Sequence, residues 1–348
     1  MKLEITPRAQ KVQYSSRLEE GDYIPYFYIK DGERKLDMQV KASYHNLLIF
    51  VNESLSAAEI DATLKVSRGY YTYVIAERPV AISHERLFHD PHVYRLFMPS
   101  DARYGVFLCD RNLKLIKAST GNDFAALLAG VPPQSTLSVR DIPPPLLIIP
   151  DVVSADLAAR LIAYHDENGD KAAVVTGSYK SRSHIHPHKE LERELDNKLC
   201  KSMLPEIKKV FYSDISHRET YKVCCYDSTV KGTFGRHRDT IFPHLHRRYA
   251  LTLTLNDDFE GGGVVFPEYN EHVVKVPKYS AIIFPGSLYH QVTEIGNGKR
   301  YVIVSFLFTE AEASIKDDTE RYRFLVQRDI CDMQINRLAP ESHGDETP

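Results

Sequence analysis

The sequence carries little net charge and no long apolar run. Its 44 lysines and arginines nearly balance its 47 aspartates and glutamates, which leaves a formal charge of −3 over 348 residues. This balance argues against a general nucleic-acid or membrane-surface binder. No apolar stretch reaches the length of a transmembrane helix, and residues 1–14 lack an apolar signal core. We therefore expect a cytoplasmic protein with no nucleic-acid or membrane partner.

Cysteine is also scarce. The five cysteines are odd in number and show no framework spacing, which indicates a reducing compartment. Cys224 and Cys225 are adjacent on a predicted strand, so their side chains should point to opposite faces. We interpret them as core thiols, with a redox pair as the alternative.

What the sequence does contain is a set of metal-ligand residues in its β-rich part, residues 237–308. His237, Asp239 and His290 supply two imidazoles and one carboxylate, the ligand set of non-haem Fe(II) oxygenases. His-x-Asp on a strand points both side chains the same way, and His290 must then come from another strand. The planar fork of Arg300 suits the far carboxylate of a dicarboxylic co-substrate.

This segment resembles the catalytic core of the prolyl-4-hydroxylase-like branch of the 2-oxoglutarate/Fe(II) dioxygenases. The shared residues are His237, Asp239, Leu255-Asn256, Gly261-Gly262, Phe266-Pro267, His290 and Arg300. The resemblance implies a double-stranded β-helix (jelly roll), Fe(II), O2, and oxidative decarboxylation of 2-oxoglutarate to succinate. Tyr226 and Thr254 fall where the family places hydroxyls that contact 2-oxoglutarate. Ascorbate is a further candidate cofactor.

The substrate is left open by the sequence. The resemblance suggests a prolyl residue in a peptide or protein, with free amino acids and small molecules as alternatives. A group of arginines would favour an acidic substrate, unless they are solvated or pair with nearby acids: Arg182, Arg236, Arg238, Arg247 and Arg248.

Residues 1–135 alternate between predicted strands and helices, which indicates an α/β sandwich. The apolar run 46–51 predicts a buried parallel strand, 105–118 a hairpin, and 56–66 and 123–129 helices, the first capped by Ser56.

Residues 21–130 are similar to the peroxiredoxin and thioredoxin-like superfamily. The similarity rests on Gly21-Asp22-x-x-Pro25-x-Phe27, on Phe50-Val51 and on 107–110. The loop 51–56 has no cysteine, although redoxin chemistry needs a thiolate there. Cys109 lies instead on a predicted buried strand. We interpret this domain as a degenerate redoxin scaffold for structure, dimerisation or substrate docking, and a homodimer is left open.

Prolines at 132–133 and 143–145 mark a linker, placed at 136–145. The dioxygenase domain should follow over 146–312, and a helix (317–330) with a polar tail should fill 313–348. Helices over 154–166, which Ser154 can cap, and over 190–211 should back the larger sheet of the barrel, which gives an α+β two-domain protein. Strands are predicted over 249–256, which alternates as a half-buried strand should, over 272–276 and over 301–308, with Arg300 at the start of the last.

Three alternating histidines, His184, His186 and His188, invite a second metal site. We prefer a polar loop at the mouth of the active site, with Tyr179, Arg182 and His184 as candidate substrate contacts. Two other functions compete with the hydroxylase: a non-catalytic metal-binding scaffold, and a thiol oxidoreductase built on the N-terminal domain.

Overall fold

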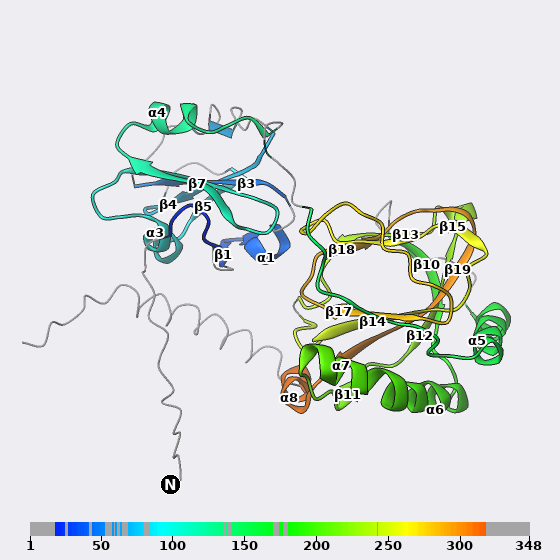
Figure 1. The fold of residues 1–348 in the computed structure, drawn as a ribbon. Coiled ribbons are helices and arrows are strands. Elements are labelled where there is room, and N and C mark those ends of the chain that lie inside the picture. Colours follow the sequence, from blue (N-terminus) through cyan, green and yellow to red (C-terminus); the bar gives the residue numbers. More distant parts are fainter. Residues whose placement is uncertain are drawn as a thin grey trace, which may run out of the picture. The chain divides into compact units, whose positions relative to one another are not determined.

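The computed structural model divides the chain into two compact units, which are described separately: one within residues 1–137 and one within 138–326 (Figure 1). The described residues are 18–317, without 25–26, 42–43, 53–57, 59, 61–62, 65–68, 80–83, 135–136, 138–140, 170–173, 177–179 and 242. Tyr179, most of the helix predicted over 56–66 and the helix predicted over 317–330 lie outside them. The domain bounds at 135, 146 and 312 stay a prediction.

The first unit is built on a five-stranded sheet of order β5-β4-β3-β6-β7, beside a two-stranded β1-β2 sheet. The strands are β1 (Tyr28–Asp31), β2 (Arg34–Asp37), β3 (Asn46–Val51), β4 (Tyr71–Ala76), β5 (Leu87–His89), β6 (Tyr104–Cys109) and β7 (Leu115–Gly121). The helices are α1 (Met38–Lys41), α3 (Pro91–Phe97) and α4 (Phe124–Ala129).

Strand β3 is buried on both faces, as its continuous apolar run predicted. It pairs in parallel with β4 and antiparallel with β6. Leu48 and Phe50 pack with α3, whereas Leu47, Ile49 and Val51 pack in the cluster that includes α4. Because side chains alternate along a strand, one run supplies two cores. The predicted α/β sandwich is confirmed in its layers, and its thioredoxin-like ancestry stays a prediction.

The second unit is a curled sheet of order β16-β18-β13-β10-β12-β19-β14-β17-β8. Its strands are β8 (Leu147–Ile149), β9 (Val174–Thr176), β10 (Lys180–Ile185), β11 (His217–Arg218), β12 (Lys222–Asp227), β13 (Thr233–His237), β14 (Tyr249–Thr254), β15 (Phe259–Gly261), β16 (Val264–Val265), β17 (Ala281–Pro285), β18 (His290–Val292) and β19 (Ile295–Phe308).

Strand β10 turns this sheet into two facing leaves. Its later residues pair with β12 in the leaf β12-β19-β14-β17, and its first two pair with β13 in the leaf β13-β18-β16. The two leaves lie one above the other in Figure 1. Antiparallel strands in two stacked leaves are the arrangement of a jelly roll. The prediction is confirmed at the level of a curled two-leaf sheet backed by helices.

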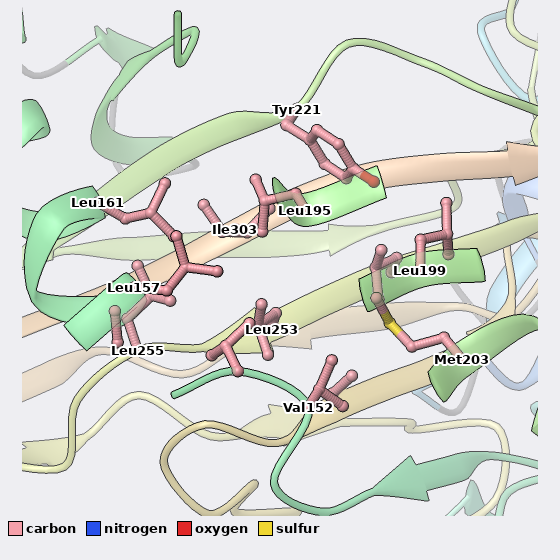
Figure 2. Close-up of a cluster of buried hydrophobic side chains, with 14 of the residues drawn as sticks. Val152, Leu157, Leu161, Leu195, Leu199, Met203, Tyr221, Leu253, Leu255 and Ile303 are labelled. Carbon is pink, nitrogen blue, oxygen red and sulfur yellow. The ribbon is translucent and has the colours of Figure 1, made fainter. Parts of the chain in front are cut away.

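Helices cover the outer face of the β12-β19-β14-β17 leaf. They are α5 (Ala155–Asn168), α6 (Lys189–Lys198), the π-helical turn η2 (Leu199–Met203) and α7 (Leu204–Phe211), while η3 (Ser228–Val230) and α8 (Glu310–Asp317) lie elsewhere. Figure 2 shows Leu157, Leu161, Leu195 and Met203 packed in one cluster with Leu253 and Ile303 of the sheet. Burying each such side chain contributes roughly 1.5–3 kcal/mol, so this layer fixes the leaf that carries Arg300. In the described part of the chain, no helix combines the length and apolarity that a bilayer crossing needs.

Three predictions about the elements of the second unit were wrong. The predicted helix 190–211 is interrupted by η2, because Pro205 has no N–H to donate within an α-helix. The strand predicted over 272–276 reduces to one bridge between Val274 and Val264. Most of the described residues of the predicted polar loop 176–188 form the strand β10. Along this strand Arg182 and His184 point to one face of the sheet, and the residues between and beside them point to the other.

Candidate metal centre and co-substrate pocket

The three predicted ligands converge at the edge of the β13-β18-β16 leaf. His237 ends β13 and is paired directly with His290, the first residue of β18. The His237 Nε2 and His290 Nε2 atoms each lie 3.5 Å from an Asp239 carboxylate oxygen. One potential ligand atom from each residue lies within 4.8 Å of the others, and this is the one such group of three among the described residues.

Both imidazoles are held with Nε2 facing this centre. His237 Nδ1 lies 2.7 Å from the Gly235 carbonyl oxygen, and His290 Nδ1 lies 3.0 Å from the Leu288 carbonyl oxygen. A carbonyl can only accept, so each Nδ1 carries a proton, and in the neutral imidazole Nε2 then keeps a lone pair. This is the outer hydrogen bond that metal-binding histidines commonly make.

The charges of the three residues also suit a divalent cation. Burial alone would raise the pKa of Asp239, but His290 and His237 outweigh it and lower the pKa to about 2. Burial, and then the neighbouring His237, lowers the pKa of His290 to about 4. At neutral pH Asp239 is therefore a carboxylate and His290 is neutral, the forms in which these side chains bind metal.

A buried ion pair ties together the segments that carry the ligands. Arg238, between two of the ligands, donates to the Glu268 carboxylate and to the Ser287 carbonyl oxygen. Glu268 also accepts from the Tyr289 backbone N–H at 2.9 Å, next to His290. Sequence reasoning missed this pair, because Glu268 lies about 30 residues from its partner and belongs to no motif.

A small cavity inside the barrel is lined by His237, Asp239 and His290 together with other residues. The polar residues of its lining are Arg182, Tyr226, His237, Asp239, Thr252, His290 and Arg300, and Phe234, Phe284, Val302 and Phe306 are among the apolar ones. Its volume is about 40 Å³. That is room for water, whose share of the liquid is about 30 Å³.

Arg300 reaches this cavity from within β19, five residues after its start, and not from the start of the strand as predicted. The turn at Gly262 makes room for it: a Cβ at Gly262 would lie 2.9 Å from Arg300 Cδ and would overlap Ile295. Arg300 is 3% exposed, and its Nη1 has no hydrogen-bond partner. Burial is the main cause that lowers its pKa.

The two hydroxyl residues expected to contact the co-substrate occupy different positions. Tyr226 lines the cavity, pairs with Arg300 across β12 and β19, and accepts from Arg182 at 3.2 Å. Thr254 is buried with Oγ1 unpartnered, and Thr252, two residues earlier, lines the cavity. Buried polar atoms without partners are rare, so Arg300 Nη1, which lines the cavity, fits a polar ligand there; Thr254 is not among the lining residues.

Three of the remaining histidines take structural positions. His186 Nδ1 lies 2.9 Å from the Tyr221 carbonyl oxygen, and His188 caps α6 by accepting from the Glu190 N–H. His246 is buried beside Glu219, with 2.8 Å between Nε2 and Oε1. These contacts account for His186, His188 and His246 without a second metal, while His184 on β10 has its ring centroid 6.1 Å from that of His186.

Comparisons with known proteins point in the same direction. The chain is 27% identical over 218 residues to a PKHD-type hydroxylase of Paraburkholderia phytofirmans, which covers 58% of this chain and 91% of the relative. It is 28% identical over 190 residues to one of Stenotrophomonas maltophilia, covering 51% of this chain and 82% of the relative. The prediction of a hydroxylase-type enzyme is confirmed by these relatives. No family model matches the sequence.

Solved structures give a weaker comparison. A Pseudomonas putida prolyl-4-hydroxylase aligns with a TM-score of 0.39 at 16% identity, covering 47% of this chain and 92% of that one. A prolyl hydroxylase from Trichoplax adhaerens, in complex with a hypoxia inducible factor peptide fragment, aligns with a TM-score of 0.40 at 16% identity, covering 49% and 86%. The fold of this chain therefore rests on its own strand pairing.

Proposed function

We propose that this protein is an Fe(II)/2-oxoglutarate-dependent hydroxylase whose metal ligands are His237, Asp239 and His290. One observation carries the proposal: two imidazoles whose Nε2 atoms face one ionised carboxylate converge beside a cavity that Arg300 also lines. This donor set fits iron and leaves positions open. Homology to PKHD-type hydroxylases supports the same reaction class.

The residues of the cavity have separate roles in this proposal. Arg300 binds the distal carboxylate of 2-oxoglutarate, with Tyr226 or Thr254 as hydroxyl donors. Val302, Val304 and Phe306 exclude water from the reacting atoms. When bound, iron and 2-oxoglutarate supply the oxidation of a C–H bond by O2, with release of succinate and CO2.

The co-substrate requires more room than the cavity provides. About 40 Å³ does not hold a five-carbon acid. The ring of Phe234 stacks on His237 at 3.7 Å between centroids, and Phe234 is half-buried on β13. We infer that binding of 2-oxoglutarate displaces side chains of the cavity lining, and that Phe234, which covers His237, is the first to move.

The substrate remains a peptide or protein, an amino acid, or a small molecule. Peptidyl proline is the first to test, because the His237–Arg300 segment resembles prolyl hydroxylases. Substrate should reach the metal past Phe234, where Lys180 also lies, 4.9 Å from the ring centroid.

The test is 2-oxoglutarate turnover by protein loaded anaerobically with Fe(II), then given O2 and ascorbate. Succinate release should disappear in His237→Ala and persist in His272→Ala, whose exposed imidazole pairs with Asp141. Calorimetric binding of 2-oxoglutarate that depends on Fe(II) should follow the same pattern. An absence of both binding and turnover in the wild type would contradict the proposal and favour the metal-binding scaffold.

A further inference from the structure

Arg182 differs from the other arginines that the sequence offered as contacts for an acidic substrate. Four of the five form ion pairs with carboxylates: Arg236 with Glu271, Arg238 with Glu268, Arg247 with Glu219 and Arg248 with Glu312. Arg182, which is 8% exposed on β10, pairs with no carboxylate of the described residues. Its charge is therefore buried without an opposite charge in direct contact.

The contacts of Arg182 hold its guanidinium in the cavity without neutralising it. Nη1 donates to Cys224 Sγ at 3.3 Å and to Tyr226 Oη at 3.2 Å, and Nε has no partner. The guanidinium carbon lies 5.3 Å from the Phe234 ring centroid and 5.8 Å from that of Tyr226. These partners orient the fork, but none is a carboxylate.

The strand register brings Arg182 beside Arg300. Ser183, the next residue on β10, pairs with Cys225 of β12, and Tyr226 of β12 pairs with Arg300 of β19. Arg182 and Arg300 thus flank Tyr226 on three neighbouring strands, and the Arg300 guanidinium lies 5.5 Å from the same ring. Burial lowers the pKa of Arg300, and the nearby charge of Arg182 lowers it further.

Two buried cations and one carboxylate line this cavity, so an anion that enters it would offset the remaining positive charge. The cost of burying each charge is several kcal/mol unless an opposite charge compensates it. Asp239 is the one carboxylate among the described lining residues; its charge acts on Arg182 through space, but it forms an ion pair with neither arginine, and His237 and His290 lie beside it. A ligand carboxylate can accept from two guanidinium forks at once.

We propose that Arg182 and Arg300 together bind the distal carboxylate of the co-substrate, so that Arg182 is a second anion-binding residue of this pocket. The inference rests on the proposed function and adds a residue to it. Two cations at this end of the pocket make the site select 2-oxo acids that carry a second carboxylate.

The test compares two acids of equal chain length on Fe(II)-loaded, anaerobic protein by calorimetry: 2-oxoglutarate and 2-oxovalerate, which lacks the distal carboxylate. Arg182→Met should weaken 2-oxoglutarate binding about tenfold or more, since a hydrogen bond to a charged group contributes about 1.5–3 kcal/mol. Binding of 2-oxovalerate should stay within about twofold of the wild type.

Arg182→Lys, which keeps the charge without the planar guanidinium, should lose less affinity for 2-oxoglutarate than Arg182→Met does. Arg248→Met, which removes a surface ion pair with Glu312, is the control and should bind both acids as the wild type does.

Other outcomes separate this inference from the proposed function. Loss of 2-oxoglutarate affinity in Arg300→Met but not in Arg182→Met would leave the hydroxylase in place and overturn the role of Arg182. Equal weakening of both acids in Arg182→Met would show a structural role and also overturn it. If Arg182→Met does not fold, the same ratio of the two acids is measured on Arg182→Lys, and an unchanged ratio overturns the inference.

Discussion

Gly262 is the residue that gives Arg300 its place in the cavity. Its φ of +66° lies in the left-handed region, and an added Cβ would meet Arg300 Cδ and Ile295. We predict that Gly262→Ala weakens 2-oxoglutarate binding and lowers stability by more than the roughly 1–2 kcal/mol that left-handed backbone costs. Gly32→Ala is the matched control, because Gly32 has φ +61° and no heavy atom within 4 Å of the added Cβ. Equal losses in urea-unfolding free energy for the two variants would contradict the steric argument.

Cys109 decides between the hydroxylase and a thiol oxidoreductase. Burial, together with the nearby Asp110, raises the pKa of the Cys109 thiol well above its ordinary range. Since the thiolate is the reactive form, we predict that Cys109 is inert in the folded protein and that Cys109→Ala leaves succinate release unchanged. Iodoacetamide labelling followed by peptide mapping should modify the exposed Cys200 and spare Cys109. Native-state labelling of Cys109, or activity lost in the alanine variant, would revive the redox function.

At the scale of elements, the Arg238–Glu268 pair holds the ends of β13 and β18 in register. Removing one partner of a buried ion pair costs roughly 3–5 kcal/mol. Glu268→Gln should fall at the low end of that range, because its amide oxygen can still accept from the Tyr289 N–H. We also expect Fe(II) affinity to fall about 10–100-fold, as when outer contacts of metal ligands are removed.

The control for that prediction is Glu271→Gln. Glu271 pairs with Arg236 with its side chain 44% exposed, so its loss should cost no more than about 1 kcal/mol. Fe(II) titration monitored by the melting temperature compares the two variants. Similar metal affinity in both would show that the buried pair serves stability alone.

Glu219 ties the segment 244–247 to the sheet. Its carboxylate accepts from Arg247 at 2.6 and 3.0 Å, and its backbone carbonyl oxygen accepts from Ser305 Oγ. Burial would raise the pKa of Glu219, but the bonds and charges of Arg247 and His246 lower it below its ordinary value. Because the folded pKa lies below the unfolded one, this stabilisation is present above the unfolded pKa of about 4.3 and is lost as pH falls through the folded pKa.

We therefore predict that Glu219→Gln is less stable than the wild type at pH 7 and that the difference shrinks as the pH falls from about 5 to 3. Urea unfolding at a series of pH values measures the difference. Glu310→Gln, whose side chain is 86% exposed, should track the wild type throughout. A difference that grows toward low pH would refute the assigned sign.

For the whole molecule, the apolar cores follow the division into two units. Two clusters draw only on residues between 18 and 137, and three draw only on residues between 146 and 308. A unit with its own core can fold alone. We predict that a fragment of residues 138–326 folds, binds Fe(II) and binds 2-oxoglutarate with the affinity of the full chain. Calorimetry of the full chain should show two unfolding transitions, and Fe(II) should raise the temperature of one of them. A fragment that does not fold would contradict the independence of the two units.

Local pattern was enough for most elements. The apolar run of β3, the cap of α5 by Ser154 and the alternation of β14 each depend on neighbours in sequence, and each was predicted. The predictions that needed correction concern segments in which two sequence patterns compete. The histidines of 184–188 looked like a polar loop, although alternation along β10 places Arg182 and His184 on its inner face. Near Pro205 the helix predicted over 190–211 contains a π-helical turn, which its apolar spacing did not indicate.

The sequence by itself determined which residues could bind a metal, because His-x-Asp, a later histidine and an arginine are chemical choices visible without coordinates. The tertiary structure decided how those residues are supported and accompanied. The pairing of β10, β12 and β19 is what places Arg182 near Arg300. The pairing of β13 with β18 is what lets Glu268 contact the segments on either side of the candidate metal site. Those contacts join residues about 30 to 118 positions apart, and long-range pairing is set by burial and register across the whole sheet and not by local spacing.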